Sequence, residues 1–131
     1  MAETLQSLIQ AAKTGATEIA PSEASDALGS GAVGLVVDVR EPDEFSEKHL
    51  PDAVNIPRGV LELRADPASP VADEALSGQR SSRVLVYCTK GPGARSLLAA
   101  QTLSGMGYEN VEVLGGGLNA WEEEGLPVEQ M

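Results

Sequence analysis

Three short, continuous runs of apolar residues constrain the fold of this chain more than any other feature. They read GLVVDV at residues 34–39, RVLVYC at residues 83–88 and NVEVL at Asn110–Leu114. Runs of this length that are rich in β-branched residues are typical of strands buried on both faces, and such strands belong to a parallel sheet covered by helices. Weaker runs at residues 17–20 and 53–56 are candidates for two more strands.

Stretches with helical signals separate these runs, at residues 22–28, 42–48, 73–76, 95–103 and 118–124. The first of them follows Pro21 and stops at Gly29, and we expect Ser22 to be its N-cap. Strands that alternate with helices, joined by right-handed crossovers, give an α/β fold. The sequence therefore predicts an open, mostly parallel sheet of about five strands with helices on both faces.

The beginning of the chain has a helical pattern of its own. Leu5, Leu8, Ile9 and Ala12 recur at helical spacing, so we expect an amphipathic helix that packs against the domain. A dimer arm and a frayed tail are the alternatives. The 131 residues suit a single core, and we divide them into an N-terminal extension, residues 1–15, and one domain, residues 16–131.

Charge and composition exclude several classes of partner. Lys and Arg number 9 against 20 Asp and Glu, a net charge of −11. Such a surface repels phosphate backbones and anionic membranes, so we expect neither nucleic acid nor a membrane as a partner. No apolar run approaches the ~20 residues of a membrane helix, and the first residues lack the apolar core of a secretory signal.

The cysteine count points to a reducing compartment. The single cysteine rules out an internal disulfide, and we expect a cytoplasmic location. One Cys and one His are too few for a structural zinc site, and we expect no cofactor.

The segment with the most chemical information is CTKGPGAR at residues 88–95. A buried strand is expected to end at Cys88, at the sheet edge where α/β proteins bind ligands. The helix after the glycine-rich loop offers free N–H groups and the positive end of its dipole. Lys90, Arg95 and that dipole favour the thiolate, which is the nucleophilic form. The same segment would suit a phosphatase, and a lone cysteine can also be an inert buried side chain.

Three separated motifs resemble those of the rhodanese family of sulfurtransferases. Residues 38–57, DVREPDEFSEKHLPDAVNIP, resemble the family's first signature, and residues 87–96 resemble its active-site loop. Residues 110–129, NVEVLGGGLNAWEEEGLPVE, resemble its closing signature. The resemblance extends over about residues 17–128. The resemblance implies a single-domain rhodanese fold and transfer of a sulfane sulfur through a cysteine persulfide on Cys88.

Roles for the other candidate residues follow. The persulfide would be held by the backbone of the loop residues Thr89, Lys90, Gly91, Gly93, Ala94 and Arg95. Arg58 follows a strand end and is a candidate for binding an anionic donor such as thiosulfate, with an exposed surface cation as the alternative. We expect Asp38 and Arg40 to form a supporting framework. The resemblance makes His49 a structural hydrogen-bonding residue rather than a catalytic base.

The loop departs from the family in length. Family sulfurtransferases usually have four residues between the cysteine and the arginine, whereas six separate Cys88 from Arg95 here. Related cell-cycle phosphatases and arsenate reductases also use longer loops, because a wider ring fits a tetrahedral phosphate or arsenate. We expect Pro92, which lacks an N–H, to push the extra residues outward as a bulge.

We therefore predict a sulfurtransferase that moves a sulfane sulfur from thiosulfate or a similar donor to cyanide or a thiol, as a monomer or a homodimer. The alternatives are a cysteine-dependent phosphatase or arsenate reductase and a non-catalytic binding module.

Overall fold

Five parallel strands form one sheet in the computed structural model, which describes residues 2–91 and 93–130. In chain order they are β1 (Thr17–Ile19), β2 (Leu35–Asp38), β3 (Val54–Asn55), β4 (Arg83–Tyr87) and β5 (Asn110–Leu114). Their order across the sheet is β1-β5-β4-β2-β3, so the two longest strands pair in the middle. The predicted α/β fold with a parallel sheet is confirmed.

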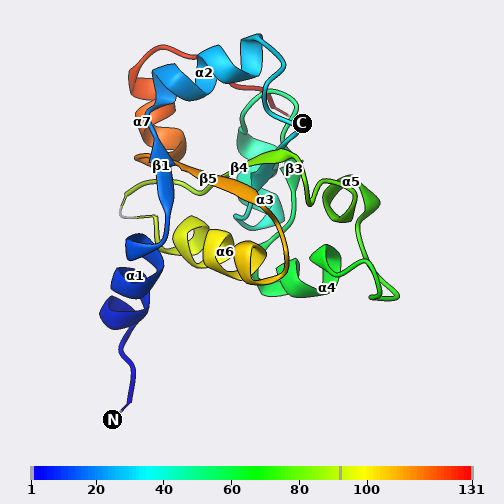
Figure 1. The fold of residues 1–131 in the computed structure, drawn as a ribbon. Helices are drawn as coiled ribbons and strands as arrows, with labels where there is room; N and C mark the ends of the chain where they lie inside the picture. The colour runs from blue at the N-terminus through cyan, green and yellow to red at the C-terminus, as the bar shows by residue number, and fades with distance from the viewer. Residues whose placement is uncertain (1, 92, 131) are drawn as a thin grey trace.

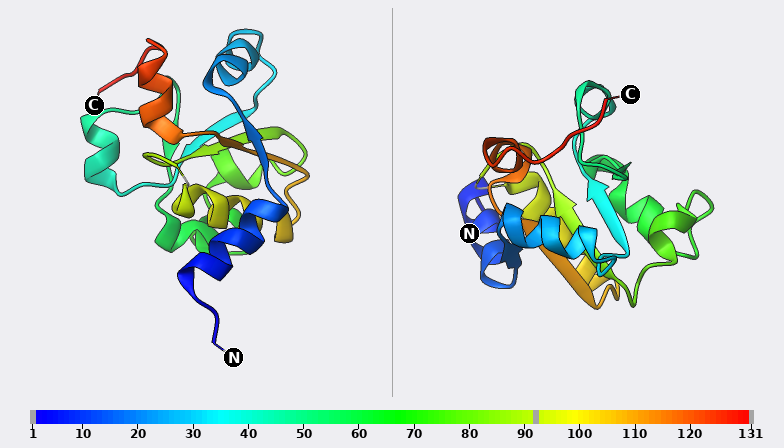
Figure 2. Two further views of the ribbon diagram at one scale, coloured as in Figure 1. Left: turned by 90° about the vertical axis from the view of Figure 1, so that its left-hand side faces the viewer. Right: turned by 90° about the horizontal axis from the view of Figure 1, so that it is seen from above.

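Helices cover both faces of this sheet (Figure 1). One face carries α1 (Leu5–Thr14), α4 (Leu61–Ala65), α5 (Glu74–Ser77) and α6 (Ala94–Gly105), and the other carries α2 (Pro21–Gly29) and α7 (Gly117–Glu123). Helix α3 (Pro42–Glu47) follows β2, and a 3₁₀ turn, η1 (Arg58–Val60), precedes α4. The C-terminal segment runs back beside α3, far from the N-terminus (Figure 2), and Glu129 there bridges to His49.

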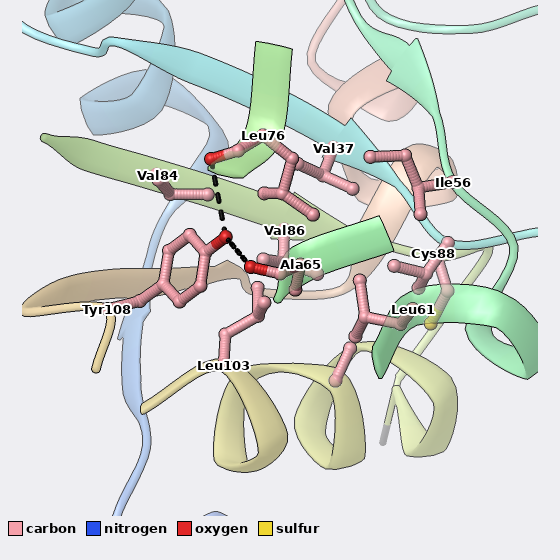
Figure 3. Packing of buried hydrophobic residues seen from close by; sticks show 12 residues of the cluster. Val37, Ile56, Leu61, Ala65, Leu76, Val84, Val86, Cys88, Leu103 and Tyr108 are labelled. Carbon is pink, nitrogen blue, oxygen red and sulfur yellow. Dashed lines mark hydrogen bonds between the residues drawn. The ribbon is translucent and has the colours of Figure 1, made fainter. Parts of the chain in front are cut away.

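Side chains of β4 alternate between two hydrophobic clusters. Val84 and Val86 pack on the side of α6, whereas Leu85 and Tyr87 pack on the side of α7. Figure 3 shows the first cluster, in which the hydroxyl of Tyr108 donates to the carbonyl oxygens of Ala65, at 2.8 Å, and Leu76, at 3.3 Å. This buried tyrosine holds the short helices α4 and α5 against the core.

The N-cap predicted for α2 is wrong. Ala20 is the N-cap, without a side-chain capping bond, and Pro21 occupies the first helical position. The fixed φ of proline suits that position, and the N–H that proline lacks has no helical partner there anyway. Ser22 is therefore inside the helix.

The predicted N-terminal helix is present as α1. Ala12 is buried against Leu97, Ala100 and Val113, so the second half of α1 packs on α6 and β5. The first half contributes less, because Leu5 keeps 63% of its surface exposed. Within the described residues, no helix has both the length and the apolar character that a membrane span requires.

Candidate active site

Cys88 directly follows β4 at the carboxyl edge of the sheet. Its side chain is 3% exposed and belongs to the same cluster as Ile56 and Leu61 (Figure 3). Above it lies an open cavity of about 390 Å³. The described residues that line the cavity are Glu44, Cys88, Thr89, Lys90, Gly91, Gly93, Ala94 and Arg95. The loop residues predicted for substrate binding are therefore together around the cysteine sulfur.

The loop ends at Gly93, which starts the twelve-residue helix α6. Gly93 is the N-cap and has a φ of 74°, in the left-handed region that favours glycine. A Cβ at this position would come within 2.9 Å of the Ser96 hydroxyl, so a larger residue would displace that side chain. Helix α6 therefore begins at the end of the loop, where its free N–H groups and the positive end of its dipole lie.

Ser96 is the polar neighbour of the cysteine sulfur. Its Oγ lies 3.3 Å from the Sγ of Cys88 and donates to the carbonyl oxygen of Gly93 at 3.0 Å. The Ser96 side chain is buried, so water does not compete for its hydroxyl. Its hydrogen atom thus has two acceptors within reach, and an ionised sulfur is the stronger of them.

Arg95 forms an ion pair with Glu44 of α3 at the cavity wall. The guanidinium donates from Nη1 to Oε1 at 2.7 Å and from Nη2 to Oε2 at 3.3 Å, and Nη2 also donates to Thr89 Oγ1 at 3.2 Å. The hydrogen bond from Arg95 lowers the pKa of Glu44 below its ordinary value, and the same bond raises the pKa of Arg95. Both side chains are charged at neutral pH.

Lys90 is the other cation of the cavity. Its side chain is exposed, and it forms no ion pair with any residue that the structure describes. It can therefore approach an anion that enters the cavity.

The N-terminus of α7 fixes the backbone of the cysteine. The N–H of Leu118 donates to the carbonyl oxygen of Cys88, and the N–H of Asn119 donates to that of Thr89, each at 2.9 Å. Gly117 has a φ of 63°, and a Cβ there would lie 2.7 Å from the Cys88 carbonyl oxygen. A glycine at position 117 is thus needed for close contact between α7 and the loop.

Asp38 and Arg40 form a buried network at the carboxyl end of β2. Asp38 Oδ2 accepts from Arg40 Nη2 at 2.8 Å, and the same Nη2 donates to the carbonyl oxygen of Lys48 at 2.6 Å. The side-chain amide of Asn55 donates to the carbonyl oxygens of Asp38 and Arg40. Burial works against the charged form of Arg40, but its contacts with Asp38 outweigh burial and raise its pKa. These bonds join the ends of β2 and β3.

His49 does not line the cavity. Its Nδ1 lies 2.9 Å from the carbonyl oxygen of Phe45, and its ring stacks on the Phe45 ring at 3.9 Å. Its Nε2 lies 3.8 Å from a carboxylate oxygen of Glu129. The histidine therefore connects α3 to the C-terminal segment.

Arg58 also lies outside the described lining of the cavity. Its guanidinium donates to Glu62 Oε1 and to Thr102 Oγ1, each at 3.0 Å, because η1 packs against α6 at that point. The structure does not bring Arg58 together with the loop residues. The predicted bulge depends on Pro92, which lies outside the described residues.

Sequence reasoning gave no role to three residues of the site: Glu44, Ser96 and Gly117. All three belong to the quoted motifs, residues 38–57, 87–96 and 110–129. A signal for Glu44 was present, because it is a carboxylate in the first turn of a helix that starts just after β2, at the same sheet edge as Cys88.

The comparisons with known proteins agree with this geometry. A family model described as "Rhodanese-like domain" matches residues 20–124. A protein named "Sulfurtransferase" from Allochromatium vinosum is 34% identical over 94 residues, which are 72% of this chain and 77% of that protein. "Thiosulfate sulfurtransferase 16, chloroplastic" from Arabidopsis thaliana is 35% identical over 94 residues, 70% of this chain and 76% of that protein.

Two solved structures extend the comparison. RPA3614 from Rhodopseudomonas palustris, described as a protein of unknown function and possible tyrosine phosphatase, matches with a TM-score of 0.88 and 30% identity, over 98% of this chain and 96% of that one. The human single-domain sulfurtransferase TSTD1 matches with a TM-score of 0.71 and 28% identity, over 84% of this chain and 98% of that one.

Proposed function

The chain belongs to the family of rhodanese-like domains, and we propose that it is a sulfurtransferase whose Cys88 carries the transferred sulfur as a persulfide. The observation that carries this proposal is the position of the Cys88 sulfur, beneath the loop cavity and 3.3 Å from the Ser96 hydroxyl. The names of the curated relatives support the same reaction class.

The first half-reaction uses the cysteine thiolate as nucleophile. The sulfur of Cys88 attacks the outer sulfur of thiosulfate, a new S–S bond forms, and the bond to the oxidised sulfur breaks. Sulfite leaves with the electron pair of that bond. The negative charge of the persulfide then faces the free N–H groups at the start of α6, the amides of residues 89–91 and 93–95 and the Ser96 hydroxyl.

The second half-reaction regenerates the thiolate. Cyanide or a thiolate attacks the outer sulfur of the persulfide, and thiocyanate or a new persulfide leaves while Cys88 recovers its electron pair. Because the sulfur stays on the enzyme between the two reactants, we expect ping-pong kinetics. The proposed donors and acceptors are small molecules. The proposed location is a reducing cytoplasm, which keeps Cys88 a thiol.

A phosphatase is the second candidate. Six residues between Cys88 and Arg95 and the similarity to the possible tyrosine phosphatase of Rhodopseudomonas palustris favour it. The lowered pKa of Glu44 counts against it. An ionised carboxylate at the cavity wall has no proton to give to a leaving alcohol.

Intact mass spectrometry after brief incubation with thiosulfate tests the proposal. Wild type should gain one sulfur atom and lose it on addition of cyanide, and Cys88→Ser should gain none. If wild type gains no sulfur but hydrolyses an aryl phosphate, and Cys88→Ser does not, the phosphatase replaces the sulfurtransferase.

A further inference from the structure

One carboxylate lies among the charged groups of the cavity. The Glu44 carboxylate accepts hydrogen bonds from both terminal nitrogens of the Arg95 guanidinium, and Nη2 also donates to Thr89 Oγ1. Glu44 and Arg95 are both only part-buried, at 33% and 40% side-chain exposure, so the carboxylate faces the cavity as well as its partner. The positive charge of Arg95 is therefore offset before any anion enters.

A donor that approaches Cys88 meets this carboxylate in addition to the thiolate. Among the described residues that line the cavity, Lys90 is the cation whose charge is not neutralised by an ion pair with an acidic side chain. The net charge of −11 acts in the same direction as Glu44, because it disfavours the entry of multiply charged anions. Each negative charge on the donor is repelled by Glu44, so a dianion meets about twice the repulsion that a monoanion meets at the same position.

Resting on the function proposed above, we propose that Glu44 is a specificity-determining residue that selects singly charged sulfur donors over dianionic ones such as thiosulfate. The donor class is an anion with its charge on the transferable sulfur and a neutral group attached to the other sulfur, as in thiosulfonates. Glu44 acts through charge and takes no part in bond making.

Methanethiosulfonate and thiosulfate form a matched pair of probes. They differ by a methyl group in place of one charged oxygen. Each gives its outer sulfur to the Cys88 thiolate, and the S–S bond of the donor breaks. Methanesulfinate or sulfite leaves with the electron pair, so the two reactions produce the same persulfide. Their leaving groups differ in reactivity, and for this reason the test compares variants rather than donors.

The experiment measures kcat/KM for both donors, with cyanide as acceptor, in wild type, Glu44→Gln and Glu47→Gln. A glutamine at position 44 keeps an oxygen that can accept from Arg95 and from the Glu41 N–H, so the helix start is preserved. Glu47→Gln is the control, because it removes the same charge from an exposed site on α3 that does not line the cavity.

The ratio of kcat/KM for thiosulfate to kcat/KM for methanethiosulfonate should rise roughly tenfold in Glu44→Gln. It should stay within about twofold of wild type in Glu47→Gln. An unchanged ratio in Glu44→Gln, or an equal rise in both variants, overturns the inference and leaves sulfur transfer intact.

A second measurement keeps the test valid if Glu44→Gln does not fold. In wild type, raising the salt concentration screens the carboxylate and should raise the same ratio; a ratio that falls or stays level overturns the inference. If neither donor leaves a sulfur atom on wild-type Cys88 by intact mass, the proposed function itself fails, and the inference fails with it.

Discussion

The Oγ of Ser96 lies 3.3 Å from the Sγ of Cys88 while it donates to the carbonyl oxygen of Gly93. Both side chains are buried at the start of α6. In the persulfide proposed above, the hydroxyl would have a charged acceptor in reach and would need only to rotate toward it. Ser96, in the first turn of α6, is thus placed to respond to the charge on the Cys88 sulfur.

Ser96→Ala should slow persulfide formation roughly tenfold, since a hydrogen bond to a charged group contributes about 1.5 kcal/mol. The rate of sulfur uptake from thiosulfate in a single turnover, followed by quench and mass spectrometry, measures the effect. Ser104→Ala, an exposed site on the same helix, is the matched control. Equal rates in the two variants would show that the Ser96 hydroxyl does not act on the sulfur.

Lys90→Gln should lower kcat/KM for thiosulfate by about tenfold, because Lys90 lines the cavity and forms no ion pair with any residue that the structure describes. Arg58→Gln should change this value by less than about twofold, because the Arg58 guanidinium binds Glu62 and Thr102 instead of facing the loop. Steady-state kinetics on both variants make the comparison. A larger loss of kcat/KM in Arg58→Gln than in Lys90→Gln would mean that Arg58 binds the donor after all.

Gly117→Ala should destabilise the fold by about 3 kcal/mol and reduce sulfur transfer as well. Its Cβ would lie 2.7 Å from the Cys88 carbonyl oxygen, and its φ of 63° is strained for alanine. Urea unfolding gives the free energy, and Gly29→Ala is the control because nothing lies within 4 Å of a Cβ there. Similar free energies for the two variants would mean that α7 does not restrain the loop.

The ion pair of Glu44 predicts a pH dependence of stability. Arg95 lowers the pKa of Glu44 below its ordinary 4.5 in the folded state, so the pair contributes stability above about pH 4.5. The contribution is lost as the pH falls through the lower folded pKa. Arg95 stays charged throughout this window, since its pKa is raised.

Urea unfolding of wild type and Glu44→Gln between about pH 7 and pH 3 measures this contribution. The difference in unfolding free energy should be level at neutral pH and shrink below pH 4.5. Its size should be below about 1 kcal/mol, because both side chains are partly exposed and solvent screens them. A difference that grows as the pH falls would contradict the assignment.

The sheet could be predicted from the sequence because its strands are continuous apolar runs. Asn110–Leu114 forms β5 with the predicted bounds, and the helix after the cysteine loop starts at Ala94, one residue before the expected position. Local patterns of this kind depend on neighbours in the chain. The error at Ser22 was also local, since Pro21 itself favours the first helical position.

The contacts of the site could not be predicted in the same way. Glu44 and Arg95 are 51 positions apart, and they meet because β2 lies next to β4 in the sheet. The local sequence around Glu44 gives no indication that Arg95 is its partner, and the reverse is also true. The direction of Arg58 depends likewise on the packing of η1 against α6, where Thr102 supplies an acceptor.

The pairing of β1 with β5 has a consequence for how this protein is made. Thr17 pairs with Glu112, and the remaining partners of β1 are Val113 and Leu114. During synthesis, β1 therefore cannot pair at the sheet edge until Glu112, Val113 and Leu114 have left the ribosome. Gly117 and Leu118, which secure the cysteine loop, emerge later still. A nascent chain that stops short of them carries its only thiol in a segment that has not yet been enclosed.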